Sequence, residues 1–234
     1  MIAGKSYLYL GSADFRRPRD KAIKHSSVDM GKVANIGAEL DPGGYPDHVR
    51  TLDAGYEVVA TELNSRSEGR EKYGNAYVVD NVYDIENVDG EVIESFDATS
   101  YPPHFAANRQ FDRIIFENPH SGRYGDGQNG LADMQAAISN KSLLEGIFRE
   151  AAKVLKPTGQ LQISVCGWPF LSHPARTLAT TQGLQWNVMG KAQEFADSLG
   201  YVFVDATDKG VRTVYRNNGT PMQLNVTKFK FRLK

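Results

Sequence analysis

Polar residues that follow a short apolar segment give the clearest sign of chemistry in this sequence. Residues 114–116, Ile-Ile-Phe, suit a buried strand, and Glu117, Asn118, Pro119 and His120 come directly after them. In open α/β sheets, ligands bind beyond the carboxyl ends of the strands. Asn118 would hold a reacting group through its carbonyl oxygen, and His120 would act as a base. Packing of His120 at the strand end is the alternative interpretation.

Three further segments place ligand-type residues after an expected strand. A strand over 6–10 is followed by a small-residue turn, which lets the main chain approach a ligand closely. An acid after the next strand, 56–61, can accept hydrogen bonds from both hydroxyls of an adenosine ribose, and an acid after 92–96 can accept the exocyclic amine of adenine. These candidate binding residues are Gly11, Ser12, Ala13, Asp14, Phe15, Glu62, Leu63, Asn64, Asp97 and Ala98, together with Asn118 and Pro119.

Aromatic residues lie in two segments, one after the central strand that ends near Glu117 and one after the strand expected beside it. Tyr124 belongs to a glycine-rich loop, and Trp168 and Phe170 follow a strand expected over 160–165. Aromatic faces attract cations, so they would suit a sulfonium ion and a bound substrate. Plain packing remains the alternative for Trp168.

The composition indicates one intracellular domain. The chain has 234 residues with a net charge of -1, and this balance gives no general attraction to nucleic acid or to an anionic membrane. The single cysteine, Cys166, excludes an intrachain disulfide and is expected to pack as a small strand residue in a cytoplasmic protein. No apolar run reaches the length of a membrane span, and none of the five histidines has metal-ligand spacing, so we expect neither a membrane nor a metal.

The elements expected to position these residues alternate between strand and helix. Besides the strands above, we expect strands over 201–204 and 224–233, the latter with a bulge near Thr227 and Lys228. Helices are expected over 65–72 and 190–199, and a third is capped by Ser139 or Asn140 and stopped at 157–159. The segment 77–79 fits either type.

Residues 16–50 are unusually polar, and we expect them to be an insertion or lid, with a first helix beginning near Ser26 or Ser27. A rival interpretation places the first strand and glycine turn at 33–38. The preferred pattern predicts a single α/β domain over 1–234. Its fold would be a Rossmann-like class I methyltransferase fold, with a mostly parallel seven-stranded sheet, helices on both faces and an antiparallel C-terminal strand.

The residues Phe111-Asp112-Arg113-Ile114-Ile115-Phe116-Glu117-Asn118-Pro119-His120-Ser121-Gly122 resemble the signature of the Rossmann-like domain of 25S ribosomal RNA uridine-N3 methyltransferases and their small bacterial relatives. The segments 8–15, 59–61, 97–99, 144–170 and the final strand also fit. The resemblance implies S-adenosylmethionine (SAM) as cofactor. Gly11 and Asp14 would then face its methionine end, Glu62 its ribose and Asp97 its adenine. The order Glu117-Asn118-Pro119-His120 departs from the family and is closer to the Asn-Pro motif of amino-group methyltransferases.

Four functions fit these features. Methyl transfer to a nitrogen or oxygen of a small molecule is the first, since the near-neutral charge does not favour RNA. Cyclisation of SAM to azetidine-2-carboxylate and methylthioadenosine, as in natural-product biosynthesis, is the second. Uridine-N3 methylation of ribosomal RNA and SAM binding without catalysis are the others. The sequence leaves the oligomeric state open.

Overall fold

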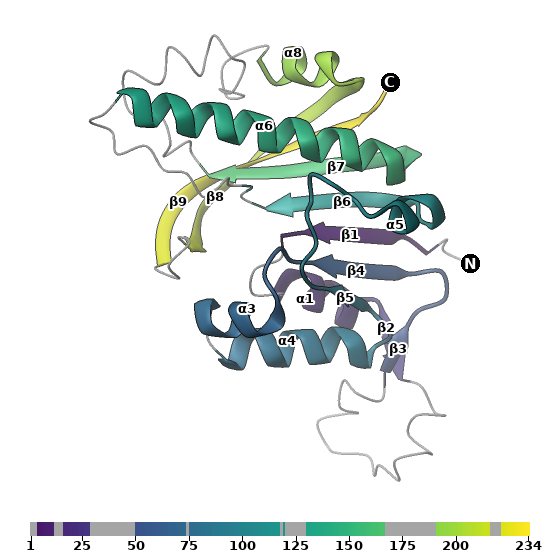
Figure 1. Ribbon diagram of the computed structural model, residues 1–234. Coiled ribbons are helices and arrows are strands. Elements are labelled where there is room, and N and C mark those ends of the chain that lie inside the picture. Colours follow the sequence, from purple (N-terminus) through teal and green to yellow (C-terminus); the bar gives the residue numbers. More distant parts are fainter. Residues whose placement is uncertain are drawn as a thin grey trace. The chain divides into compact units, whose positions relative to one another are not determined.

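The computed structural model describes residues 4–11, 16–28, 50–73, 75–117, 119, 130–166, 191–215 and 221–234. The chain divides into two compact units, Met1–Asp97 and Ala98–Lys234. Together they provide the strands of a mostly parallel seven-stranded sheet (Figure 1). This confirms the predicted Rossmann-like fold class with its antiparallel C-terminal strand. The two units are described in turn.

Unit 1 contains three parallel strands in the order β5-β4-β1: β1 (Ser6–Leu10), β4 (Glu57–Thr61) and β5 (Glu91–Ile93). All five residues of β1 are buried, as expected for a parallel strand with both faces covered. The helices of the unit are α1 (Arg16–Lys24), α3 (Arg66–Tyr73) and α4 (Asn75–Asn87). The expected strands 6–10 and 56–61 and the expected helix 65–72 are therefore confirmed within a residue or two, and the undecided segment 77–79 is helical.

The beginning of the expected insertion is regular structure. Helix α1 occupies 16–24, and Ser26–Val28 form strand β2, which pairs antiparallel with β3 (Arg50–Leu52). Our placement of the first helix near Ser26 is wrong. The helix is hard to recognise because only Pro18 and Ala22 are buried, and Pro18 is tolerated in a first turn. Residues 29–49, which include the rival strand at 33–38, lie outside the described part, so a lid there stays a prediction.

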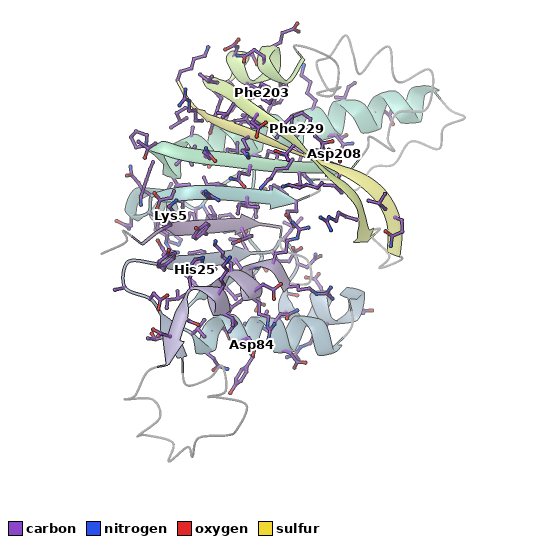
Figure 2. All side chains as sticks on the ribbon, turned by 180° about the vertical axis from the view of Figure 1, so that it is seen from behind. Lys5, His25, Asp84, Phe203, Asp208 and Phe229 are labelled. Carbon is purple, nitrogen blue, oxygen red and sulfur yellow. The ribbon has the colours of Figure 1, made fainter. Side chains whose placement is uncertain are left out.

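A stack of three rings supports the amino ends of β1 and β4. The imidazole of His25 lies 4.3 Å from the ring of Tyr56 and 6.3 Å from that of Tyr7, and Lys21 Nζ lies over Tyr7 (Figure 2 labels His25). Burial, followed by the charges of Lys21 and Lys24, lowers the pKa of His25, which favours the neutral ring. The folded protein therefore favours the neutral form of His25 in this ring stack.

Unit 2 contains four strands in the order β6-β7-β9-β8: β6 (Phe111–Glu117), β7 (Leu155–Cys166), β8 (Tyr201–Tyr215) and β9 (Pro221–Leu233). Strand β6 pairs parallel with β7, whereas β9 pairs antiparallel with both β7 and β8. Its helices are α5 (Pro103–Asn108), α6 (Gly130–Val154) and α8 (Lys191–Ser198). The two closing antiparallel strands are confirmed, although they are longer than we expected.

An aromatic cluster forms the core of unit 2. Phe148 of α6 is fully buried, and its ring lies 4.9 Å from the rings of Tyr201 and Phe231 and 5.3 Å from that of Phe195. All three contacts are T-shaped, a favourable geometry for aromatic pairs. The Tyr201 hydroxyl donates to the Phe148 carbonyl oxygen at 2.8 Å. Phe148 thus joins α6 to α8 and to the final hairpin, β8 and β9.

Two boundary predictions in unit 2 are wrong. Helix α6 begins at Gly130, so Ser139 and Asn140 do not cap it, and the Asn140 side chain is buried within the helix. The pairing of β9 with β7 runs without a shift through Thr227 and Lys228, and the irregularities fall in β8, at 203–205 and 208–211. The out-of-phase apolar residues of β9 need no bulge, because alternate residues of a strand point to opposite faces: Val226 is buried on one face, and Phe229 and Phe231 are buried on the other.

Among the helices that the structure describes, none has both the length and the apolar character that a membrane crossing requires.

Candidate functional site

The carboxyl ends of β1 and β4 bring two of the predicted ligand residues together. Tyr9 lies opposite Ala60 in the parallel pair, and Thr61 Oγ1 donates to the Tyr9 carbonyl oxygen at 3.2 Å. Gly11 and Glu62 each follow two residues after this register pair. Gly11 and Glu62 therefore lie at the same edge of the sheet, beyond the carboxyl ends of the two strands, where α/β proteins bind ligands.

Gly11 has the backbone conformation that its predicted role requires. Its φ angle is 56°, in the left-handed region that glycine adopts at no steric cost. The main chain turns sharply there, with no side chain between it and a ligand. The rest of the predicted turn, Ser12, Ala13, Asp14 and Phe15, lies outside the described residues and stays a prediction.

Glu62 is a buried carboxylate, with 6% of its surface exposed. Its Oε1 accepts a 2.6 Å hydrogen bond from Asn64 Nδ2. Its main chain is fixed on both sides, because its N–H donates to the Ile93 carbonyl and its carbonyl accepts from the Phe96 N–H, at 3.0 and 2.9 Å. A buried carboxylate needs hydrogen-bond donors, and ribose hydroxyls are suitable ones. Asn64 orients Glu62 through this bond, and its predicted contact with the cofactor stays a prediction.

Leu63 is exposed to an unusual degree for a leucine that directly follows a buried strand. The exposed fraction of its surface is 66%. An isolated exposed leucine is ordinary on protein surfaces, but this one lies between the two residues that form the Glu62 carboxylate contact. It offers an apolar surface on which a flat ring such as adenine could pack.

The loop after β5 carries the third predicted acid. Ser95 has a φ angle of 53°, which is uncommon for a residue with a side chain, Phe96 is buried, and Asp97 is exposed. The turn at Ser95 is followed by a change in burial: one residue enters the core and the next faces solvent. Ala98, also predicted to contact cofactor, is half-buried and begins unit 2.

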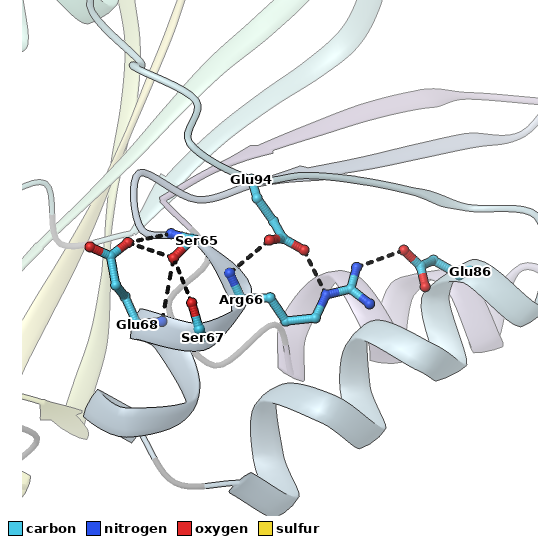
Figure 3. Close-up of polar contacts among 6 residues, drawn as sticks. All are labelled: Ser65, Arg66, Ser67, Glu68, Glu86 and Glu94. Carbon is cyan, nitrogen blue, oxygen red and sulfur yellow. Dashed lines mark hydrogen bonds and ion pairs between the residues drawn. The ribbon is translucent and has the colours of Figure 1, made fainter.

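An ion-pair group between these loops was missed at the sequence level. Arg66 donates through its main-chain N–H to Glu94 Oε2 at 2.7 Å and through Nε to Glu94 Oε1 at 2.6 Å, and its Nη2 reaches Glu86 Oε1 at 3.0 Å (Figure 3). Partial burial opposes the charge, but the hydrogen bonds to Glu94 and Glu86 outweigh it and raise the pKa of Arg66. The partners are 28 and 20 residues apart, so no local pattern indicates them.

A capping box fixes the start of α3 in the same region. Ser65 N–H donates to Glu68 Oε2 at 2.8 Å, and Glu68 N–H reaches Ser65 Oγ at 3.4 Å (Figure 3). The pattern Ser-x-x-Glu before a helix is recognisable in the sequence, and it gives the helix boundary directly. Together with Glu94 it satisfies main-chain donors of the first turn.

The predicted catalytic and acceptor-side residues belong to unit 2. Strand β6 ends at Glu117, which lies opposite Ser164 of β7, and Pro119 is buried. Asn118, His120, Tyr124, Trp168 and Phe170 lie outside the described residues, so their roles stay predictions. Within the described ranges there is no group of three or more His, Cys, Asp or Glu side chains that could hold a metal ion.

A family comparison identifies the chain. The model of the family described as rRNA (uridine-N3-)-methyltransferase BTM5-like matches residues 47–198, which is more than half of the sequence. The chain belongs to the BMT5-like family. The predicted resemblance is thereby confirmed.

Solved structures resemble this BMT5-like chain at the level of the fold. A protein from Thermoplasma acidophilum assigned to the methyltransferases aligns with a TM-score of 0.50 at 8% identity, over 99% of this chain and 69% of that one. A mutant of the 16S rRNA (adenine(1408)-N(1))-methyltransferase from Catenulisporales acidiphilia, solved with SAM, aligns with a TM-score of 0.49 at 15% identity, over 99% and 86%. No curated protein matches the chain. Family and fold together place the BMT5-like chain among the SAM-dependent methyltransferases.

The family assignment changes one expectation from the sequence. The family is described by an RNA substrate, so our view that RNA is not favoured finds no support. The comparisons give no support to azetidine formation or to natural-product biosynthesis either.

Proposed function

We propose that this BMT5-like chain binds SAM at the carboxyl ends of β1, β4 and β5 and transfers its methyl group to an acceptor, with a nitrogen as the first candidate for the accepting atom. The observation that carries the binding proposal is the buried Glu62 beside the Gly11 turn. The carboxylate would accept the ribose hydroxyls, Leu63 would pack against adenine, and Asp97 would accept the adenine amine.

In the transfer, the acceptor nitrogen attacks the methyl carbon in line with the carbon–sulfur bond. The bond to sulfur breaks and leaves a neutral thioether, S-adenosylhomocysteine, while the nitrogen loses its proton. Such a displacement needs alignment of the two reactants and exclusion of water more than covalent help. Asn118 would hold the acceptor through its amide oxygen, and His120 would take the proton.

An RNA base nitrogen is the first candidate for the acceptor, because the family that matches residues 47–198 is described by uridine-N3 methylation. A nitrogen or oxygen of a small molecule is the second candidate, favoured by the net charge of -1. RNA-binding surfaces are usually strongly basic, since phosphate contacts dominate the affinity.

The decisive experiment is to incubate purified protein with SAM alone, with SAM and uridine-containing RNA, and with SAM and a small-molecule extract, followed by mass spectrometry. We expect S-adenosylhomocysteine only when an acceptor is present, together with an acceptor heavier by one methyl group. Methylthioadenosine and azetidine-2-carboxylate from SAM alone would show cyclisation instead. SAM binding without any product would indicate a binding module.

The role of Asn118 is tested by Asn118→Ala. We expect a fall in kcat of about 100-fold with little change in the Kd for SAM, because an aligning residue acts mainly in the transition state. Equal losses in turnover and SAM binding would remove Asn118 from the chemistry.

A further inference from the structure

The two loops that carry Glu62 and Asp97 are joined by side chains as well as by the main chain. Parallel pairing places Thr61 opposite Ile93, so the loops leave the sheet together. Glu62 then exchanges main-chain hydrogen bonds with Ile93 and Phe96. These bonds fix the first loop against the second through the main chain.

Glu94 ties the second loop to the start of α3. Both of its carboxylate oxygens are used by Arg66, at 2.7 Å to the main-chain N–H and at 2.6 Å to Nε. A carboxylate held in this way has a defined orientation, because a separate donor binds each of its two oxygens. Glu86 on α4 holds the other end of the guanidinium at 3.0 Å (Figure 3).

The contact between Arg66 and Glu94 bears on Asp97 because Glu94 lies directly before the turn that leads to Asp97. The next residue, Ser95, has a positive φ angle of 53°. A residue with a side chain seldom adopts such a conformation, which persists only where its neighbours hold it. Glu94 is held by Arg66 on one side, and Phe96 is held on the other by burial and by its hydrogen bond to Glu62. Asp97 comes next.

We infer that Arg66 and Glu94 are positioning residues of the cofactor site, which set the adenine-facing carboxylate of Asp97 against the ribose-facing carboxylate of Glu62. The inference rests on the proposed SAM site and adds to it the residues that determine recognition of the adenine base. Arg66 and Glu94 touch neither reactant. They act through the Ser95 turn.

The test uses Glu94→Gln, which keeps the side-chain volume but removes the charge and one acceptor. The matched control is Asp112→Asn, because the Asp112–Lys156 pair of unit 2 has a similar length, 2.8 Å, and similar exposure. A second control, Glu86→Gln, removes only the outer contact of Arg66. Each variant is assayed for its Kd and KM for SAM, its kcat, and its preference for SAM over the inosine analogue, in which an oxygen replaces the adenine amine.

We expect Glu94→Gln to raise the Kd and KM for SAM about tenfold with kcat nearly unchanged, since loss of a charge-assisted pair at a partly exposed site has an effect of this order. The preference for SAM over the inosine analogue should fall by a similar factor, because Asp97 would no longer be held in position. General loosening would not change this preference. Both control variants should match the parent.

Failure of the inference and failure of the proposed site give different results. If the parent binds no SAM, the proposed site is wrong and the positioning role falls with it. If the parent binds SAM and Glu94→Gln keeps both the affinity and the preference for adenine, the positioning role is wrong and the site stands. Should Glu94→Gln not fold, Arg66→Lys serves instead, because lysine keeps the charge but cannot make the Nε contact, and the same two readouts decide.

Discussion

Glu62 is the residue on which the binding proposal depends most directly. It is buried, its main chain is fixed by Ile93 and Phe96, and Asn64 fixes one oxygen of its carboxylate. A side chain held in this way loses little conformational entropy when a ligand binds, so its hydrogen bonds contribute fully to affinity.

Glu62→Gln therefore tests the site at the level of one residue. We expect the Kd for SAM to rise roughly 10- to 100-fold, because hydrogen bonds from ribose to a carboxylate are replaced by weaker ones to an amide. Calorimetry at 25 °C measures the change. Glu71→Gln, at an exposed position of α3, is the control and should bind as the parent does. Parental affinity in Glu62→Gln would place the ribose elsewhere.

His25 provides a pH test, also at the residue scale. Because its folded pKa is lowered, the unfolded chain binds the proton more readily, and the stabilisation is present above the ordinary pKa of 6.5 and is lost as the pH falls below it. We expect the free energy of unfolding to decrease on going from pH 7 to about pH 5, a range set by the histidine pKa. His25→Phe, which keeps a ring in the stack, should remove part of this decrease.

The measurement is urea unfolding at a series of pH values. His104→Gln is the control, since His104 is exposed on α5 and its replacement should leave the pH profile unchanged. An unaltered profile in His25→Phe would assign the acid sensitivity to other groups.

At the scale of the element, α3 connects the two loops of the proposed site. It begins where the loop with Glu62 ends, and its first residue, Arg66, binds Glu94 at the start of the loop with Asp97. Its capping box and its contact with Glu94 meet within the first turn, so the helix start is fixed from two directions. Ser65→Ala should lower the free energy of unfolding by about 1 kcal/mol, the usual effect of losing an N-cap side chain. Urea unfolding measures it, and Ser67→Ala, whose hydroxyl contacts only that of Ser65 in this group, should have a smaller effect. A larger effect in Ser67→Ala would contradict the capping role of Ser65.

How far the sequence predicts elements depends on how local their signals are. Strands β1, β4 and β6 were found because buried parallel strands are short apolar runs, and the acids at their ends could be placed by the general rule for α/β sheets. Helix α1 was missed because only Pro18 and Ala22 are buried. The start of α6 was placed at least ten residues too late, at 140 or 141 instead of 130, because polar residues within the helix resemble caps.

The residues that we propose to face the ligand have local signals in the sequence, whereas the contacts that support them do not. Gly11, Glu62 and Asp97 each follow an apolar run, which is a signal contained in a few neighbouring residues. The pairing of Arg66 with Glu94 depends on a contact across 28 positions, and Ser95, the residue after Glu94, adopts a left-handed conformation although it carries a side chain. Neither has a pattern in the sequence.

At the scale of the whole molecule, each unit has its own buried core. Strands β1 and β4 bury Leu8, Leu10, Val58 and Val59 in the first, and the aromatic cluster around Phe148 forms much of the second. We predict from the sequence that the chain is one domain, which requires both units to unfold together.

Two core variants test this prediction. Leu8→Ala in unit 1 and Phe148→Ala in unit 2 each remove a fully buried side chain and should lower the free energy of unfolding by roughly 2–5 kcal/mol. In one cooperative domain, calorimetry should show a single transition that both variants shift to lower temperature. Two transitions, each moved by only one variant, would show two independent domains.

Added SAM at about 100 times its Kd should raise the parent's free energy of unfolding by about 2.7 kcal/mol, because the ligand binds only the folded state.

Strand β8 is the last strand in the order of the sheet, and its irregular pairing with β9 affects how copies of the protein associate. A straight margin offers a regular row of amide and carbonyl groups to which a strand of another molecule can add. In β8 that row is interrupted at 203–205 and again at 208–211, with Gly210 at a φ of 66°, and Asp205 and Asp208 place charge along it. Concentrated solutions should consequently resist fibril growth, and removing the second interruption by deleting Gly210, the one extra residue that β8 has there, should promote it.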